Sequence, residues 1–186
     1  MRERILKAFI EEAQKKSIKF TMDDLAQNLG ISKRTIYEHF TSKKEILETI
    51  IEKSFNEIKE KEEAIINRKD IPTVDKIKEI LTIVPDYFDL YNQQILDQMK
   101  KYYPEQWEKV RFELKNTWNN LRLLLEQGIQ EGVIKNYSIP IIMKIISSST
   151  NWFYDQNYLL NNRININDAF TTTAEILMFG LVNEKK

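Results

Sequence analysis

Between Ser32 and Lys43 the sequence carries a run of side chains that donate hydrogen bonds over a long reach. Such donors suit the base edges and phosphates that line a DNA major groove, where ammonium, guanidinium and hydroxyl groups make most contacts. The segment therefore predicts a nucleic-acid-binding surface. With Thr21, one helix earlier, the candidate DNA-binding residues are Ser32, Lys33, Arg34, Thr35, Tyr37, His39 and Lys43.

Several of these side chains also have an interpretation without DNA. Lys33 and Arg34 would suit a solvated helix face, and Tyr37 could pack on a preceding helix. Lys43 stands at the start of a predicted helix, where a cation opposes the helix dipole, so a phosphate partner explains it better than stability does. We interpret the set as DNA contacts because the pattern of two short helices joined by a turn, which surrounds these residues, is complete.

Residues for catalysis or metal binding are scarce. The chain has no cysteine, a single histidine and no glycine-rich phosphate loop. One histidine cannot build a histidine-rich metal site, and the lack of cysteine excludes thiolate sites and disulfides. We therefore expect no catalytic residue, no metal and no cofactor, and the sequence argues against an enzyme.

Three predicted helices position the candidate DNA contacts. The first covers Arg2–Lys16, with an apolar stripe at fourfold spacing. Thr21 is a suitable N-cap for the second, and Gly30 ends it because a left-handed residue at that place is cheapest as glycine. Ser32 caps the third helix, which runs to about Phe40. The stripe of the first helix is Ile5, Phe9 and Ala13.

The rest of this segment supplies the packing. Ser42–Glu45 reads as a capping box that opens a long helix ending near Asn67. The inward side chains of the two short helices fill the space against the first helix. They are Leu25, Ala26, Leu29, Ile31, Ile36 and Phe40.

This arrangement closely resembles the N-terminal signature of the TetR family of repressors. The resemblance implies a homodimer that binds a palindromic operator in double-stranded DNA through the second helix of the motif. It also implies a C-terminal domain whose ligand loosens DNA binding. Glu38 departs from the family pattern by placing a negative charge beside the phosphates. The matching residues are Leu25-Ala26, Gly30-Ile31-Ser32, Thr35-Ile36-Tyr37, His39-Phe40, Lys43 and Ile46-Leu47.

The composition favours long helices in a chain without a membrane span. Of 186 residues 42% are hydrophobic, and 4 glycines with 4 prolines are too few for repeated tight turns. The charged start shows no signal peptide, and no stretch approaches the roughly 20 apolar residues of a membrane helix. We expect a cytoplasmic protein. Its net charge is zero, but residues 1–47 hold 10 basic against 7 acidic side chains.

We therefore predict an all-α fold of about nine helices. A helix-turn-helix DNA-binding domain is expected over residues 1–47, and a helical ligand-binding and dimerisation domain over residues 48–186. Beyond the long helix, the expected helices cover Thr73–Ile83 with Thr73 as cap, Pro85–Tyr102, Pro104–Gly132, Ile139–Leu160, and a last one carrying Phe170 to Leu181.

Aromatic residues gather in the second part of the chain. Each one alone is better explained as core. As a group they could wall a pocket for a hydrophobic or aromatic small-molecule effector. The candidate ligand-binding residues are Tyr87, Tyr91, Trp118 and Trp152.

The predicted helix Ile139–Leu160 has two apolar stripes, whereas a surface helix needs only one. One stripe carries Ile142, Ile146, Ser149 and Phe153, and the other carries Ile141, Ile145, Ser148 and Trp152. We assign the first stripe to a twofold dimer interface, with a matching stripe on the last helix. That stripe is Phe170, Ala174, Leu177 and Leu181.

Two functions remain open from the residues alone. The first is a ligand-responsive repressor. The second is a helix-turn-helix module that binds DNA for a structural or partner-protein role without a small molecule. An aromatic-rich core and an aromatic-rich pocket look alike in sequence, so the lining of a cavity is the observation that separates them.

Overall fold

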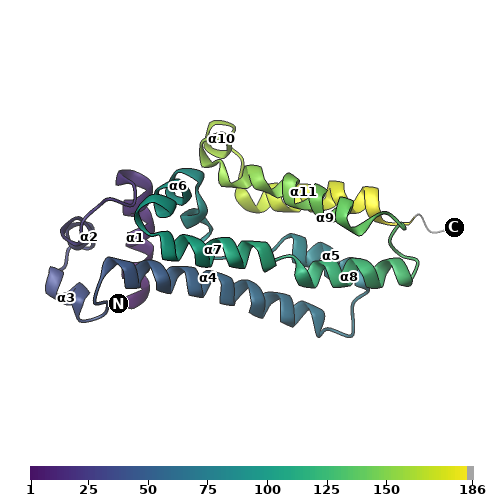
Figure 1. Ribbon diagram of the computed structural model, residues 1–186, viewed down its shortest axis with the longest axis horizontal. Helices are drawn as coiled ribbons and strands as arrows, with labels where there is room; N and C mark the ends of the chain where they lie inside the picture. Colours follow the sequence, from purple (N-terminus) through teal and green to yellow (C-terminus); the bar gives the residue numbers. More distant parts are fainter. Residues whose placement is uncertain (184–186) are drawn as a thin grey trace. The chain divides into compact units, whose positions relative to one another are not determined.

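The computed structural model describes residues 1–183, except for the side chain of Gln156, and confirms the all-α prediction (Figure 1). No strand occurs in this range; Ile134 and Val182 form one isolated antiparallel bridge. The elements, with η for 3₁₀ turns, are α1 Arg2–Lys16, α2 Met22–Leu29, α3 Lys33–Tyr37, α4 Lys43–Ile66, α5 Thr73–Leu81, η1 Phe88–Tyr91, α6 Gln93–Tyr102, α7 Pro104–Asn116, α8 Asn119–Gln130, α9 Ile139–Asn151, η2 Trp152–Tyr154, α10 Gln156–Asn161 and α11 Ile166–Leu181.

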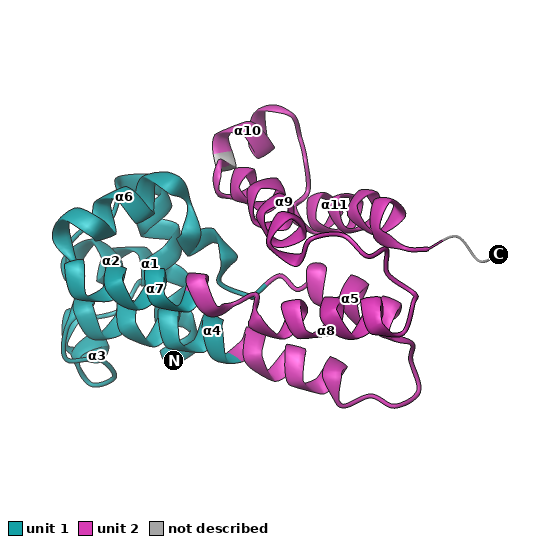
Figure 2. Cartoon of the chain, turned by 45° about the vertical axis from the view of Figure 1, so that its right-hand side comes forward, with its two compact units in different colours: residues 1–56, 85–113 teal, residues 57–84, 114–186 magenta. Residues whose placement is uncertain are grey.

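The chain forms two compact units, coloured separately in Figure 2. Unit 1 consists of residues 1–56 and 85–113, and unit 2 of residues 57–84 and the chain from Leu114 onward. Helix α4 contributes its first part to unit 1 and its second part to unit 2. Unit 1 thus extends past Leu47 and includes a second, distant segment. A functional boundary at Leu47 stays a prediction.

Unit 1 is built around α1, whose predicted stripe is buried. Ile5 and Phe9 have no exposed surface, and the ring of Phe20 meets that of Phe9 edge-on at 4.9 Å. Residues 85–113, the second segment of unit 1, also contact α1 and the loop that follows it. Tyr87, just before η1, donates a hydrogen bond to Glu3, and Gln98 of α6 accepts one from the Ile18 amide at 2.7 Å.

Unit 2 has its own apolar core between α5, α8, α9 and α11. Because each of these helices turns a stripe inward, the core needs no sheet to cover it. The buried members include Ile77, Leu121, Leu125, Ile134, Ile146 and Ala174.

Two of the expected long helices are interrupted, which raises the number of helices in residues 1–183 above the expected nine. The segment Pro104–Gly132 breaks after Asn116, at residues of low helix propensity. The segment Ile139–Leu160 breaks after Asn151. There the hydroxyls of Ser147 and Thr150 bond to preceding backbone carbonyls, and such bonds compete with helical hydrogen bonding.

Smaller differences concern helix ends. Helix α3 ends at Tyr37 rather than near Phe40. Thr73 does not cap α5, because the N-cap is Pro72 and Thr73 is the first helical residue. The segment from Pro85 opens with the η1 turn before α6 begins.

The structure places the first stripe of α9 in the core and leaves most of the second stripe exposed. Ile142, Ile146 and Phe153 are at most 3% exposed and pack inside unit 2, whereas Ile141 and Ile145 are 60% and 50% exposed. Our assignment of the first stripe to a dimer interface is therefore corrected, since those side chains are already used by the core. Ser149 is half-buried.

Helix α11 follows the same rule. Phe170, Ala174 and Leu181 are buried and Leu177 is half-buried, so the expected interface stripe belongs to the core. The exposed apolar side chains of α11 are instead Ile176 and Phe179.

Gly128 in α8 tests the tightness of the unit 2 core. A Cβ at this position would lie 2.6 Å from Cγ1 of Ile134, which is buried. We expect Gly128→Ala to lower the free energy of unfolding by about 1–3 kcal/mol, because overpacking outweighs the helix propensity that alanine adds. Thermal unfolding measures this. Gly180→Ala in α11 is the matched control, since its Cβ meets no atom within 4 Å; equal melting temperatures for the two variants would contradict the packing argument.

Candidate nucleic-acid interface

Helix α2 begins with the cap that the sequence predicts. The Thr21 hydroxyl accepts a hydrogen bond from the Asp24 amide at 3.2 Å, and the Asp24 carboxylate accepts one from the Thr21 amide at 2.7 Å. This reciprocal box satisfies backbone groups that a helix start leaves without partners. The Thr21 side chain is thus engaged within its own helix.

The turn of the motif depends on the backbone of Gly30. Its φ of 64° lies in the left-handed region, which a residue with a Cβ rarely adopts. Its amide and that of Ile31 donate to carbonyls of the last turn of α2. The turn therefore ends α2 and redirects the chain into α3 within three residues, Gly30 to Ser32.

Helix α3 has only five residues and is held by its surroundings. The Ser32 hydroxyl caps it by accepting from the Thr35 amide at 3.1 Å. Ile36 and Phe40 are buried, and the Arg2 guanidinium stacks on the Phe40 ring while donating to the His39 carbonyl at 2.5 Å. Sequence reasoning missed Arg2, because the contact spans 37 residues and no local pattern marks it.

The outer face of α3 presents three of the candidate residues. Arg34 is the most exposed, with 90% of its side chain accessible, and Tyr37 is 45% exposed. Lys33 is exposed as well and lies beside the first turn of α2. The structure therefore places a guanidinium, a phenol and an ammonium on one surface.

Both cations on this face have carboxylate partners in the same unit. Lys33 Nζ lies 2.8 Å from Asp23 Oδ2, and Arg34 Nε lies 3.5 Å from Glu38 Oε1. The Asp23 contact raises the pKa of the Lys33 ammonium. These ion pairs are exposed, so water screens them and another anion can replace the carboxylates at little cost.

The remaining candidates differ in accessibility. Thr35 is half-buried, and its hydroxyl lies 2.8 Å from that of Ser32. His39 is half-buried at the end of the motif. Only part of each side chain therefore faces solvent.

Lys43 is half-buried and binds the loop between α1 and α2. Its ammonium donates to the carbonyls of Ile18 and Phe20 and lies 3.9 Å from the centre of the Phe20 ring. Burial lowers the pKa of this ammonium to about 8, although the negative charge of Asp24 acts in the other direction and raises it. An ammonium has three N–H donors, so two carbonyl contacts leave one for a further acceptor.

The capping box that we expected at Ser42–Glu45 is only half formed. The Ser42 hydroxyl accepts from the Glu45 amide at 3.1 Å. The Glu45 carboxylate reaches back one residue further and accepts from the amide and hydroxyl of Thr41.

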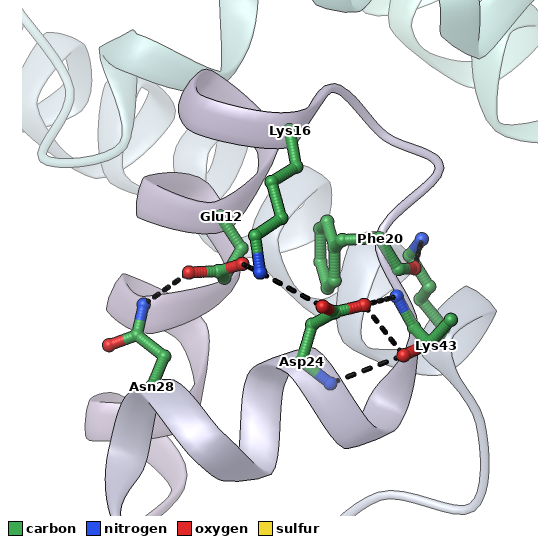
Figure 3. A network of polar contacts seen from close by, with 7 residues as sticks. Glu12, Lys16, Phe20, Asp24, Asn28 and Lys43 are labelled. Atoms are coloured by element: carbon green, nitrogen blue, oxygen red, sulfur yellow. Dashed lines mark hydrogen bonds and ion pairs between the residues drawn. The ribbon is translucent and has the colours of Figure 1, made fainter.

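A polar network joins α1 to α2 (Figure 3). Lys16 Nζ lies 3.1 Å from the Glu12 carboxylate and 2.9 Å from that of Asp24, and Asn28 donates to Glu12 at 2.8 Å. The buried Glu12 charge is thereby paired, as burial requires. The network thus links α1 to α2 through side-chain contacts in addition to their apolar packing.

The four candidate ligand-binding residues are divided between the two units. Tyr87 and Tyr91 are buried in unit 1, where Tyr91 meets the Phe55 ring edge-on at 5.7 Å. Trp118 and Trp152 belong to unit 2 but line different cavities. A role of these four residues in effector binding stays a prediction.

In residues 1–183, no three histidine, cysteine or carboxylate side chains gather as metal ligands. No helix in the same range is both long and apolar enough to cross a membrane.

Comparison with known proteins places the motif in context. Residues 5–50 match the model of the TetR family, described as bacterial regulatory proteins. The HTH-type transcriptional regulator YvaF of Bacillus subtilis (strain 168) is 28% identical over 186 residues, which is 100% of this chain and 98% of that protein. The likeness thus extends beyond the motif to both units.

Solved structures share the fold at lower identity. The TetR family transcriptional regulator PfmR from Thermus thermophilus superposes with a TM-score of 0.75 at 22% identity, over 95% of this chain and 97% of its own. The transcriptional regulator FadR from Bacillus subtilis, in complex with stearoyl-CoA, gives a TM-score of 0.64 at 20% identity, over 97% and 99% of the two chains. At these identities the likeness is one of fold.

Asp24 gives the network a measurable pH dependence. Lys16, and next the hydroxyl and amide of Thr21, hold the pKa of the Asp24 carboxyl well below its ordinary value of 3.8. Because the folded-state pKa is the lower one, this stabilisation is present above pH 3.8 and is lost as the pH falls below it. We expect Asp24→Asn to lower the melting temperature at pH 7. The difference between the melting temperatures at pH 7 and at about pH 3 should be smaller for this variant than for the wild type.

Asp23→Asn is the matched control for this prediction, since it removes the same charge from the same helical turn. Asp23 pairs with the exposed Lys33, so its loss should change thermal unfolding less. Equal shifts for the two variants would contradict the role given to the network.

Proposed function

Because this chain belongs to the TetR family of bacterial regulatory proteins and is a transcriptional regulator with that family's DNA-binding helix-turn-helix, we propose that it is a homodimeric repressor released from a palindromic operator by a small molecule. The observation that carries the proposal is the outer face of α3. Its donors stand on a helix whose cap and buried side chains fix it in place.

Helix α3 reads the major groove in this proposal. Arg34 is suited to the acceptors of guanine, because a guanidinium matches two of them at once. Tyr37, Ser32 and the third N–H of Lys43 serve phosphates, which position the protein without reading sequence. DNA replaces the carboxylates of Asp23 and Glu38 as partners of the two cations.

A twofold dimer forms through the exposed apolar side chains of α9 and α11. Ile141, Ile145, Ile176 and Phe179 are each at least half exposed, and Phe179 is 90% exposed. So many large apolar side chains on two helices of one unit are unfavourable in water and favour a partner surface. A second copy of this chain supplies the same surface, and two copies of α3 then match a palindrome.

The effector acts on unit 2 in this proposal. The related fold of FadR is known in complex with stearoyl-CoA, which supports control of this chain by a small molecule as well. Helix α4 has residues in both units, so a shift of its second part carries over to the helix-turn-helix. Two half-sites lie about 34–36 Å apart on B-DNA, and a change in the separation of two α3 helices weakens binding.

The DNA contacts are tested by Tyr37→Phe and Arg34→Ala. We expect Tyr37→Phe to weaken binding of the dimer to every operator variant about a hundredfold, because each of the two subunits loses a hydrogen bond to a charged group that contributes about 1.5 kcal/mol. Arg34→Ala should instead relax the preference at one base pair per half-site. Fluorescence anisotropy on a palindrome selected from random duplexes, and on its single-base-pair variants, measures both effects.

Lys100→Ala is the control, because it removes one exposed charge from α6 of the same unit. If Tyr37→Phe and Arg34→Ala bind these duplexes like Lys100→Ala, α3 is not the DNA-reading helix.

The dimer is tested by placing a charge on the exposed face. We expect Ile145→Glu and Phe179→Glu to weaken self-association at least about a hundredfold, because each buries an unpaired charge twice in a symmetric interface. Leu123→Glu in α8 is the control, since Leu123 is also exposed, at 62%, but lies outside this face. Light scattering at micromolar concentration gives the mass. A monomeric wild type, or a dimer that tolerates all three charges, would overturn the assignment.

A further inference from the structure

Unit 2 contains a groove of about 630 Å³ between α7, α8 and α9. This volume lies within the range of pockets that hold small molecules. Its lining comes from the end of α7, the start of α8, one side of α9 and Tyr154 of η2. All of these residues belong to unit 2.

The groove uses a third face of α9. Residues 140, 143, 144, 147 and 151 line it, and their spacing of three and four places them on one side of the helix. The buried stripe with Ile146 and the exposed stripe with Ile145 occupy the other two sides. A ligand in the groove would therefore touch the helix that carries both the unit 2 core and the proposed dimer face.

The charged side chains of the groove are all basic. Lys115, Arg122 and Lys144 line it, and no carboxylate does. Among the residues that the structure describes, none forms an ion pair with Lys115 or Lys144. Arg122 is partly satisfied, because its Nε lies 2.9 Å from Glu126. Three cations beside one cavity favour an anion and disfavour a cationic ligand.

The uncharged part of the lining is mainly apolar. Trp118, Met143 and Ile139 are half-buried and pack against the unit 2 core on their inner sides. Their remaining surface faces the groove, where an apolar chain or ring would remove it from water. Burial raises the pKa of the Tyr154 phenol to about 12, so this group stays neutral. The groove thus combines apolar walls with cations.

We propose that this groove binds an anionic amphipathic small molecule. Lys115, Arg122 and Lys144 hold its carboxylate or phosphate head, and Trp118 and Met143 cover its apolar tail. The inference rests on the effector-controlled function proposed above and gives the chemical class of that effector. It departs from a purely hydrophobic or aromatic ligand, which would make no use of the three cations.

Four twelve-carbon probes test this on the full-length protein: dodecanoate, dodecyl phosphate, dodecanol and dodecyltrimethylammonium. They share the tail and differ in the head, and the first two distinguish a carboxylate from a phosphate source. Titration calorimetry below the micelle concentration gives the affinities. We expect at least one anion to bind about tenfold or more tightly than dodecanol, because a charge-assisted hydrogen bond adds affinity at that scale. The cation should bind most weakly.

The site is located by Lys144→Gln. This change should weaken binding of the preferred anion about tenfold and leave dodecanol binding unchanged. Lys69→Gln is the matched control, because Lys69 is an exposed lysine of unit 2 that does not line the groove. If the anions bind no better than dodecanol, or if both variants lose affinity equally, the groove is not an anion site and the inference is overturned.

Operator binding measured on the same samples separates this inference from the proposed function. Anion binding that Lys144→Gln weakens and that lowers operator affinity supports both. The same anion binding without any change in operator affinity supports the groove and overturns effector release. Operator binding by a protein that ignores every anionic probe overturns the groove and leaves DNA recognition standing.

Discussion

The exposed donors of α3 depend on one packing contact, that of the short helix-turn-helix with α1. A helix of five residues is too short to be stable alone in water. It persists here because Ile36 and Phe40 are buried and because Ser32 caps its first turn. Everything that holds α1 therefore also holds α3. That includes Tyr87 and Gln98, which lie far along the chain and bond to α1 and to the loop after it.

In unit 2, helix α9 is the element on which several surfaces depend, as α3 depends on α1 in unit 1. Its 13 residues divide their side chains over a core face, an exposed apolar face and the wall of a basic groove. A rotation or shift of this helix cannot alter one face without altering the other two, since protein interiors are close-packed. This shared use explains why the segment has two apolar stripes although it is not fully buried.

The sequence was informative where signals are local. The bounds of α1, the cap at Thr21 and the left-handed Gly30 follow from periodicity and backbone preference, and the structure has all three. It was less informative where the outcome depends on tertiary contacts. Periodicity shows that α9 has two apolar stripes but not which one the core uses, and the Ser and Thr side chains that end α9 are also compatible with a longer helix. The partners of Lys33, Lys43 and Arg2 lie on other elements or across turns, so composition could not reveal them.

The two ion pairs on α3 have a consequence for how such a protein finds its site. A regulator in a cell meets a vast excess of unrelated chromosomal sequence, and its attraction to that excess grows with the number of unneutralised cations. Here Asp23 and Glu38 stand beside Lys33 and Arg34, in a chain of zero net charge. In the proposed DNA complex, these carboxylates compete with the phosphates for the two cations. DNA of unrelated sequence offers phosphates but few matching base edges, whereas the operator adds contacts to base edges. In this proposal the two carboxylates lower the affinity for all DNA and shorten the time that the protein spends on unrelated sequence.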